Sequence, residues 1–378
     1  MFGSFIQSRI LCFRQTVFGE VSLLAMSLWW IASIPTARGQ DCVLLTKVHE
    51  NLAGFNLSSV AYGDGIWMAV GSSRSVLISD NGTGWMALDS GIDRHYRDLV
   101  WMGDRFVLFS DGLGPEIYLV TWSQANGFEY YPGLFQAGSR SQAIGWDGTN
   151  LIVAFYYGLF DSGFLAIVKN FSELTFLGAH CGEAQDIDSH GGLTVVSVEC
   201  FMDSIAYRGE IRYSFDGVNF ERQAIGPHKS EGAGGVATNG LVAFANGKLS
   251  FPDPEMPEYL LAHSPEIGTQ AFTLYSETMP TFSTVMVDAD WVTPVFAGVG
   301  PVGEMGYSTD GLSWTQIESP NLGTMRRIVP TEKNRFVAVG EFETIIIGDI
   351  APPIADFEDW PLAATCLDLV RTQNCLAQ

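Results

Sequence analysis

The sequence predicts an all-β fold, a seven-bladed β-propeller of four-stranded antiparallel blades, and three observations support this prediction. An apolar strand, a turn of glycine, aspartate or asparagine, and a second apolar strand recur along residues 40–350. The unit repeats about every 40 to 50 residues, which is the spacing typical of propeller blades. The strands are short, and no sustained 3.6-residue hydrophobic period precedes the C-terminal tail, which argues against an α/β fold.

The repeated unit occurs seven times. The strand–turn–strand segments span residues 59–71, 99–109, 143–154, 186–196, 235–244, 285–298 and 327–340. In the sixth and weakest copy, the first strand is expected at 285–287 and the turn directly after it. A third short apolar strand follows each copy, and in six copies a fourth strand with a leading aromatic residue follows, as at 85–88.

The seventh copy lacks its fourth strand, because the sequence DIAPP at 349–353 interrupts the pattern. Residues 43–48, near the other end of the repeat region, have the apolar pattern of the missing strand. We therefore predict that 43–48 complete the last blade and close the ring. Closure removes the open sheet edges that would otherwise invite aggregation.

Composition predicts a sizeable core and argues against nucleic acid as a partner. Hydrophobic residues make up 47% of the chain and aromatic residues 12%. The chain has 42 acidic and 20 basic residues and a net charge of −22, whereas a nucleic-acid-binding protein needs a basic face. An acidic, apolar-rich chain is compatible with an extracellular protein, a cation site or a basic partner.

The first 39 residues have the pattern of a signal peptide. Arg9 and Arg14 precede an apolar run over 21–35, and Ala37 and Gly39 place small residues before a cleavage site. The run is shorter than a typical span of about 20 residues. We predict a signal peptide (1–39), a propeller (40–350), a C-terminal tail (351–378), and a secreted or periplasmic protein without a membrane span after cleavage. An uncleaved anchor is the alternative.

Five cysteines remain after the predicted cleavage, and none has the C-x-x-C spacing of a zinc site. Disulfides are expected in an exported protein. We predict a Cys181–Cys200 bridge, because these residues follow the end of the third blade and the second strand of the fourth, which are neighbours. Cys42 is expected to pair with Cys366 or Cys375 and to tie the tail to the closing blade; a local Cys366–Cys375 bridge is the alternative.

Three predicted turns share the pattern S-x-D-G-x-x-W. Asp-Gly and Asn-Gly accept positive φ angles, the serine and aspartate side chains can bond turn N–H groups, and the aromatic side chain can pack into the blade. The motif residues are Ser79, Asn81, Gly82 and Trp85; Ser214, Asp216, Gly217 and Phe220; and Ser308, Asp310, Gly311 and Trp314.

This pattern resembles the Asp-box of the sialidase-type (BNR) propeller superfamily. With the Val-Gly pairs at 70–71 and 299–300, the chain looks most similar to Asp-box propellers of the photosystem II assembly factor type. The resemblance covers residues 42–350 and implies the propeller fold. In those families the box is structural and lies away from the ligand face, so the resemblance implies no site residue.

Catalytic motifs are weak in this chain. A sialidase needs an arginine cluster, a Tyr/Glu pair and an F/Y-R-I-P motif near its start, and the nearest string, Arg327 to Pro330, lies in the last blade with an extra residue. Residues 298–303 fit G-x-G-x-x-G, but no helix follows to receive a phosphate, so we interpret them as a loop. We expect no cofactor, with calcium as the alternative.

Carboxylates recur in the loops between the second and third strands, which emerge on one face of a propeller. We name this set the acidic rim: Asp111, Glu116, Asp161, Asp203, Glu210, Asp253, Glu255, Glu258, Glu304, Glu341 and Glu343. The rim could bind calcium or a basic peptide, or supply an acid/base pair for glycoside hydrolysis. The alternative is a set of solvated acidic residues on unrelated loops.

Within the rim, residues 247–258 form the longest loop, and three prolines stiffen it. Fixed φ angles lower the entropy lost on binding. We therefore predict that Asp253, Glu255 and Glu258 belong to the binding surface. The predicted function is a non-catalytic exported propeller that binds a protein or glycan partner. The alternative is a sialidase-like glycan-active hydrolase or lyase.

Overall fold

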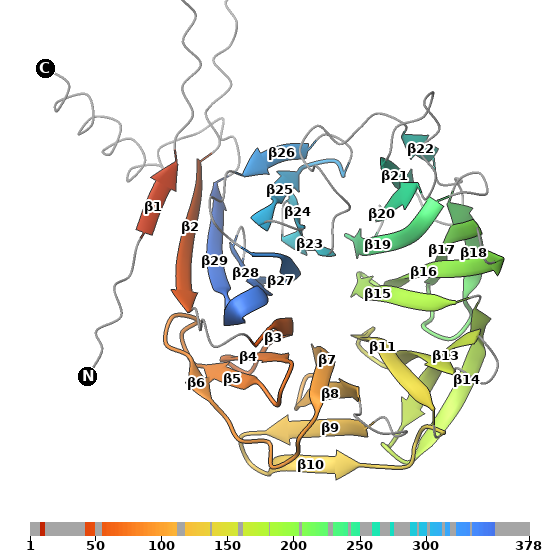
Figure 1. Ribbon diagram of the computed structural model, residues 1–378, viewed down its shortest axis with the longest axis horizontal. Coiled ribbons are helices and arrows are strands. Elements are labelled where there is room, and N and C mark those ends of the chain that lie inside the picture. The colour runs from red at the N-terminus through yellow and green to blue at the C-terminus, as the bar shows by residue number, and fades with distance from the viewer. Residues whose placement is uncertain are drawn as a thin grey trace, which may run out of the picture.

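The computed structural model describes residues 8–11, 42–49, 55–111, 118–136, 138–157, 162–180, 182–203, 206–225, 230–240, 243–249, 259–264, 273–275, 288–292, 295–300, 303–311, 314–317, 323–332 and 335–351. Antiparallel sheets surround a central axis in this part of the chain (Figure 1). The predicted all-β propeller with four-stranded antiparallel blades is therefore confirmed. Within the described ranges, no helix is long and apolar enough to span a membrane.

Six sheets have four strands each, in chain order from the axis outward. Blade 1 is β3 (Leu57–Gly63), β4 (Ile66–Gly71), β5 (Val76–Ser79) and β6 (Met86–Ala87), and blade 2 is β7 (His95–Trp101), β8 (Phe106–Asp111), β9 (Tyr118–Ser123) and β10 (Gly127–Tyr131). Blade 3 is β11 (Ser139–Trp146), β12 (Leu151–Tyr157), β13 (Ser162–Lys169) and β14 (Glu173–His180), and blade 4 is β15 (Glu183–His190), β16 (Leu193–Asp203), β17 (Ala206–Ser214) and β18 (Glu221–Ile225). Blade 5 is β19 (Ser230–Thr238), β20 (Ala243–Leu249), β21 (Tyr259–Ser264) and β22 (Thr273–Tyr275), and blade 6 is β23 (Asp288–Val292), β24 (Val295–Val299), β25 (Met305–Ser308) and β26 (Trp314–Ile317).

The remaining sheet has five strands, so it differs from the expected four-stranded blade. Its order is β1-β2-β29-β28-β27, and a 3-10 turn, η2 (Glu341–Glu343), joins β28 to β29. Its strands are β27 (Met325–Glu332), β28 (Arg335–Gly340), β29 (Ile345–Ala351), β2 (Cys42–His49) and β1 (Ser8–Leu11). Strand β2 contains residues 43–48 and pairs antiparallel with β29, from Cys42 opposite Ala351 to His49 opposite Ile345. The added outer strand β1 comes from the region of the predicted signal peptide.

The hydrophobic core lies between neighbouring sheets. Because successive strand residues point to opposite faces, β8 contributes Phe106 to a cluster shared with blade 1 and Phe109 to a cluster shared with blade 3. The five-stranded sheet and blade 1 are packed in the same way, since Val337 of β28 lies in one buried cluster with Leu57 and Val60 of β3. Burial on both faces explains the nearly continuous apolar runs of the second strands.

One strand position differs from the prediction. The first strand of the sixth copy was expected at 285–287, which lie outside the described residues, and its turn directly afterwards. The structure instead places β23 at Asp288–Val292. The Asp-Ala-Asp run at its start has the composition of a turn, but it lies in an inner strand, where the axis of the ring accommodates polar side chains.

Candidate functional site

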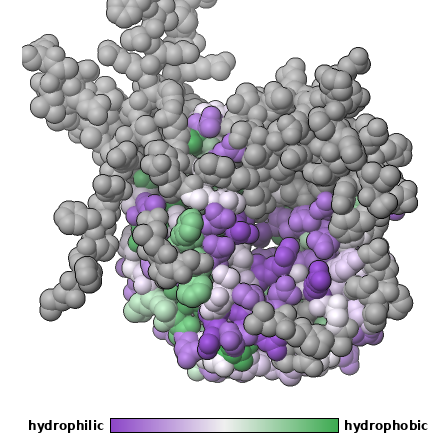
Figure 2. Space-filling model, in the orientation of Figure 1, coloured by the Kyte–Doolittle hydropathy of each residue, from purple (hydrophilic) through white to green (hydrophobic). Residues whose placement is uncertain are grey.

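The innermost strand of each blade has one backbone edge without a partner strand. The N–H groups on such an edge need hydrogen-bond acceptors when they are buried. Strands β3, β7, β11, β15, β19, β23 and β27 surround the axis of the ring (Figure 1). Figure 2 shows hydrophilic side chains gathered around this axis. The axis is therefore the place where polar side chains can meet these free edges.

Side chains of one inner strand accept hydrogen bonds from the backbone of the next inner strand. The bonds run from Ile144 N to Asp98 Oδ2 (2.9 Å), Ala184 N to Gln142 Oε1 (2.9 Å), Val236 N to Asp186 Oδ2 (3.1 Å) and Thr238 N to Asp188 Oδ2 (2.7 Å). Blades 1 and 2 are joined differently, because Ser59 Oγ donates to Asp98 Oδ1 at 2.8 Å. These side chains fasten neighbouring blades to each other.

Four charged groups meet at the axis, and we name Asp186, Asp188, Asp290 and Arg327 the axial cluster. Arg327 of β27 donates from Nη1 to Asp186 Oδ1 of β15, so an ion pair links the five-stranded sheet to blade 4. Burial raises the pKa of Asp188 well above its usual value, and the neighbouring Asp290 carboxylate raises it further. The Thr238 N–H bond and the Arg327 charge act in the opposite direction. The cluster therefore combines a buried ion pair with a carboxyl group that resists ionisation.

The cluster is not arranged as a metal site. Among the residues that the structure describes, no three His, Cys, Asp or Glu side chains are placed to hold a metal ion. The predicted calcium alternative belonged to the acidic rim, of which the structure describes only a part, so that alternative stays a prediction.

Four rim positions lie where the prediction placed them, near the ends of second strands or the starts of third strands. Asp111 ends β8, Asp203 ends β16, and Glu304 directly precedes β25. Glu341 follows β28, is half-buried, accepts a hydrogen bond from Thr324 N at 3.1 Å and pairs with Arg326 at 3.6 Å. Five rim residues lie outside the described residues: Glu116, Asp161, Asp253, Glu255 and Glu258.

Glu343 lies in the predicted loop whereas Glu210 does not, and both side chains are buried. Glu210 lies within β17, is 2% exposed, and binds Arg212 at 2.7 Å and Arg222 at 3.4 Å. These arginines are its neighbours on the same sheet, so the buried carboxylate charge is balanced within the blade.

Glu343 is 6% exposed and lies between the last and first blades. It accepts a hydrogen bond from Ser75 Oγ at 2.9 Å, and His49 Nε2 lies 3.7 Å from its second oxygen. Its φ of 50° turns the chain so that the carboxylate points inward.

The three motif turns form the predicted hydrogen bonds. Asp216 Oδ1 accepts from the backbone N–H groups of Asn219 (2.7 Å) and Val218 (2.9 Å), and these bonds lower the pKa of Asp216. Ser214 Oγ donates to the same carboxylate at 2.9 Å, and Ser308 does the same to Asp310. In the other two turns the indole N–H of the tryptophan donates to the motif glycine, from Trp85 to Gly82 (2.7 Å) and from Trp314 to Gly311 (3.2 Å). The motif residues therefore shape the turns.

The cysteines are described only in part. Cys200 is disulfide-bonded and fully buried. Cys42 begins β2, whereas Cys181, Cys366 and Cys375 lie outside the described residues. The predicted pairings stay predictions.

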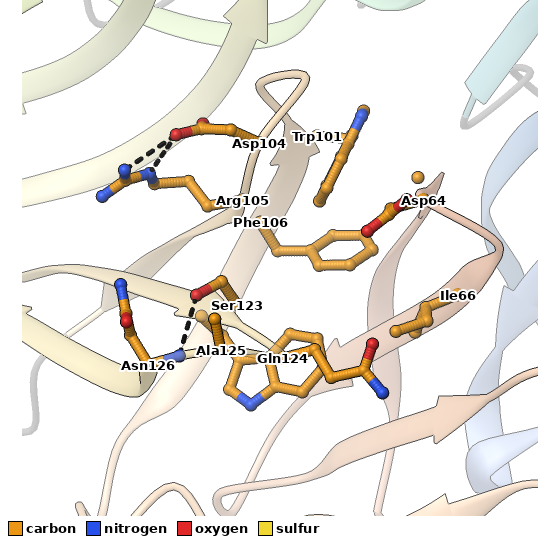
Figure 3. A pocket seen from close by; sticks show the side chains of 12 residues that line it. Asp64, Ile66, Trp101, Asp104, Arg105, Phe106, Ser123, Gln124, Ala125 and Asn126 are labelled. Carbon is orange, nitrogen blue, oxygen red and sulfur yellow. Dashed lines mark hydrogen bonds and ion pairs between the residues drawn. The ribbon is translucent and has the colours of Figure 1, made fainter.

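A pocket of about 460 Å³ lies where three turns of blades 1 and 2 meet. The turns join β3 to β4, β7 to β8 and β9 to β10. Aromatic rings of Trp101, Phe106 and Trp122 line it together with polar side chains (Figure 3). Sequence reasoning assigned Trp101 and Phe106 to strands and missed the pocket. The signal that could have found it is an aromatic residue on each side of the turn between β7 and β8.

Comparison with known proteins supports the fold but does not assign a family or a function. No protein-family model matches the chain, and no curated protein matches it. Among solved structures, the chain is similar to YCF48 from Cyanidioschyzon merolae, with a TM-score of 0.58 and 10% identity over 80% of this chain and 98% of that one. It is also similar to YCF48 bound to D1 peptide, with a TM-score of 0.57 and 13% identity over 81% of this chain and 96% of that one.

These similarities define the class of protein, a β-propeller. At the level of the fold, they agree with the predicted likeness to propellers of the photosystem II assembly factor type. Membership of the Asp-box superfamily stays a prediction.

Proposed function

We propose that this chain is a non-catalytic, exported propeller that binds a protein partner and acts as a scaffold for it. The observation that carries this proposal is that carboxylates near the axis bind the backbone of the ring itself. Asp98, Asp186 and Asp188 each accept a backbone N–H from the next blade, so they serve the ring itself. A ring fastened in this way presents its loops on a rigid frame, which lowers the entropy lost on binding. A YCF48 structure of the same fold is bound to a D1 peptide, which supports a peptide or protein ligand for such a ring.

The five-stranded sheet supports a second part of the proposal, that β2 closes the ring. Leu45 of β2 packs against the core between blade 6 and the five-stranded sheet, and Val48 packs against the core between the five-stranded sheet and blade 1. Both faces of β2 therefore contribute to the packing of the closing sheet. We propose that the last blade is completed by this N-terminal strand, whether or not β1 is present.

The partner surface is proposed to be the part of the acidic rim that is not fully buried. Asp111, Glu304 and Glu341 are half-buried in the described part of the chain, and the Pro-rich loop adds Asp253, Glu255 and Glu258. A net charge of −22 attracts a basic protein from a distance and raises its association rate.

The rim is tested by replacing Asp253, Glu255 and Glu258 with Asn, Gln and Gln. We expect this variant to bind an immobilised lysine-rich peptide several-fold more weakly, with a smaller dependence of the on-rate on salt, in biolayer interferometry. The matched control replaces the exposed Asp80, Glu173 and Glu221 with Asn, Gln and Gln, which removes the same charge elsewhere. Equal binding by the two variants would contradict a local role of the loop.

One observation favours the alternative of a glycan-active hydrolase. Arg327 and three carboxylates converge at the axis, and glycosidases use a pair of carboxyl groups of different pKa. A panel of fluorogenic sialosides and hexosides tests this alternative. Hydrolysis by the wild-type chain that is lost in Asp290→Asn, with an unchanged circular dichroism spectrum, would replace the binding proposal with an enzymatic function.

A further inference from the structure

The pocket between blades 1 and 2 is independent of the proposed rim. The turns that form it join first to second strands and third to fourth strands, whereas the rim loops join second to third strands. In an antiparallel blade these two kinds of connection emerge on opposite faces. The volume of about 460 Å³ lies in the range of small-ligand sites.

Aromatic rings form a fixed wall of this pocket. The ring centroids of Trp101 and Phe106 are 4.8 Å apart, and those of Phe106 and Trp122 are 5.9 Å apart. Phe106 and Trp122 are buried, while Trp101 is half-buried. A Cβ atom at Gly63 would overlap the Trp101 ring, so this glycine leaves the space in which the indole packs. The wall is therefore preformed.

The electrostatics of the pocket favour a cation. Asp64 is exposed on the turn between β3 and β4. The one arginine in the lining, Arg105, is already held by Asp104 through Nε (3.0 Å) and Nη2 (2.7 Å) and lies 3.6 Å from Glu129. Asp104 and Arg105 lie on one side of the pocket and Asp64 on the other, with Trp101 and Phe106 between them (Figure 3). The Asp64 carboxylate can therefore attract a cationic ligand, and it would repel an anion.

We propose that this pocket binds an organic cation, an alkylammonium or guanidinium group, held by the half-buried ring of Trp101 in the aromatic wall and by the carboxylate of Asp64. Cations bind aromatic faces through the ring quadrupole, and tryptophan is the strongest of the aromatic side chains in this respect. Gln124 lines the same space and offers a hydrogen-bond acceptor to an N–H donor. The cation is either a lysine or arginine side chain of a peptide or a free small amine.

A corresponding pocket lies between the closing sheet and blade 1. Residues of the chain supply an aromatic pair, a guanidinium and a carboxylate there. That pocket measures about 320 Å³ and is lined by Tyr62 and Trp67, whose ring centroids are 4.5 Å apart. Tyr62 and Trp67 face each other across β3 and β4 as Trp101 and Phe106 do across β7 and β8. There the chain supplies its own guanidinium, since Arg335 lines the space and binds Asp349 at 2.6 Å. A guanidinium, a carboxylate and an aromatic pair thus line one pocket at this position of the fold.

The test uses the full chain and four probes in isothermal titration calorimetry. The cationic probes are acetyl-Gly-Lys-Gly-amide and arginine amide, and the neutral probes are acetyl-Gly-Gln-Gly-amide and methyl glucoside. We expect both cationic probes to bind and both neutral probes to bind at least about fivefold more weakly, given the size of cation–π and ion-pair contributions. The tighter of the two cationic probes identifies the source of the group.

Two variants locate the binding. Asp64→Asn and Trp101→Leu are each expected to weaken the cationic probes about threefold to tenfold. Asp80→Asn, an exposed carboxylate of the corresponding pocket, is the matched control and is expected to leave binding unchanged. If Trp101→Leu fails to fold, Asp64→Asn decides, because asparagine tolerates the φ of 51° found at this turn. Equal binding of the neutral probes, or unchanged binding by Asp64→Asn, would overturn the proposal.

Discussion

Deleting residues 40–50 is expected to lower the melting temperature by about 5 °C or more, or to cause aggregation on heating. The deletion removes β2, whose side chains Leu45 and Val48 pack on the two faces of the five-stranded sheet. Two half-buried aliphatic side chains contribute about 1 kcal/mol each, and the lost β2–β29 hydrogen bonds add about 1 kcal/mol or more. In a domain of this size, 1 kcal/mol lowers the melting temperature by about 2 °C. The exposed edge of β29 would also invite pairing between molecules.

The matched reference is the chain that begins at residue 40, since the one described element that it lacks is the short outer strand β1. This reference is expected to melt within a degree or two of the full chain, as measured by circular dichroism at 218 nm. The chain that begins at residue 51 should melt well below both and show increased light scattering. If all three chains melt together, β2 does not close the ring.

The repeated apolar pattern was enough to predict the blades, because strands buried on both faces leave continuous hydrophobic runs. The second strands β4, β8 and β12 are nearly all apolar and were placed correctly. The inner strands are harder to predict, since they alternate between core and axis and admit polar residues. Strand β23 begins with Asp-Ala-Asp, and this composition led to its assignment as a turn.

The roles of individual carboxylates were less predictable than the fold. Glu210 and Glu343 have the same sequence surroundings as solvated loop residues, but Glu210 pairs with arginines of β17 and β18 and Glu343 bonds to Ser75, and both lie in the interior. The axial cluster joins residues more than a hundred positions apart, as in the pair of Asp186 with Arg327. The pocket of Trp101 and Trp122 likewise needs three turns to meet. Such contacts depend on the closing geometry of the ring, which no local pattern encodes.

Substitutions at Asp186 and Asp188 are expected to change stability in opposite directions, although these residues lie two positions apart on β15. Asp186→Asn removes the charge that pairs with Arg327 inside the ring, and breaking a buried pair costs about 3 kcal/mol or more. We therefore expect a clearly lower melting temperature for Asp186→Asn at pH 7. The asparagine oxygen can still accept the Val236 N–H, so the loss reports on the ion pair.

For Asp188→Asn we expect a higher melting temperature at pH 7 to 8 and almost no change at pH 4. Burial and Asp290 raise the pKa of Asp188 in the folded state, so the folded chain binds more protons than the unfolded chain above the ordinary aspartate pKa. The stability of the wild type then decreases as the pH rises from the ordinary aspartate pKa through the raised pKa of Asp188. Asparagine carries no charge at any pH and can accept the Thr238 N–H bond as the carboxyl group does. Melting curves measured at each half unit from pH 4 to pH 8 should diverge in favour of the variant. A variant that is equally destabilised at every pH would show that the Asp188 carboxylate stabilises the axis, which would contradict the raised pKa of Asp188 in the folded state.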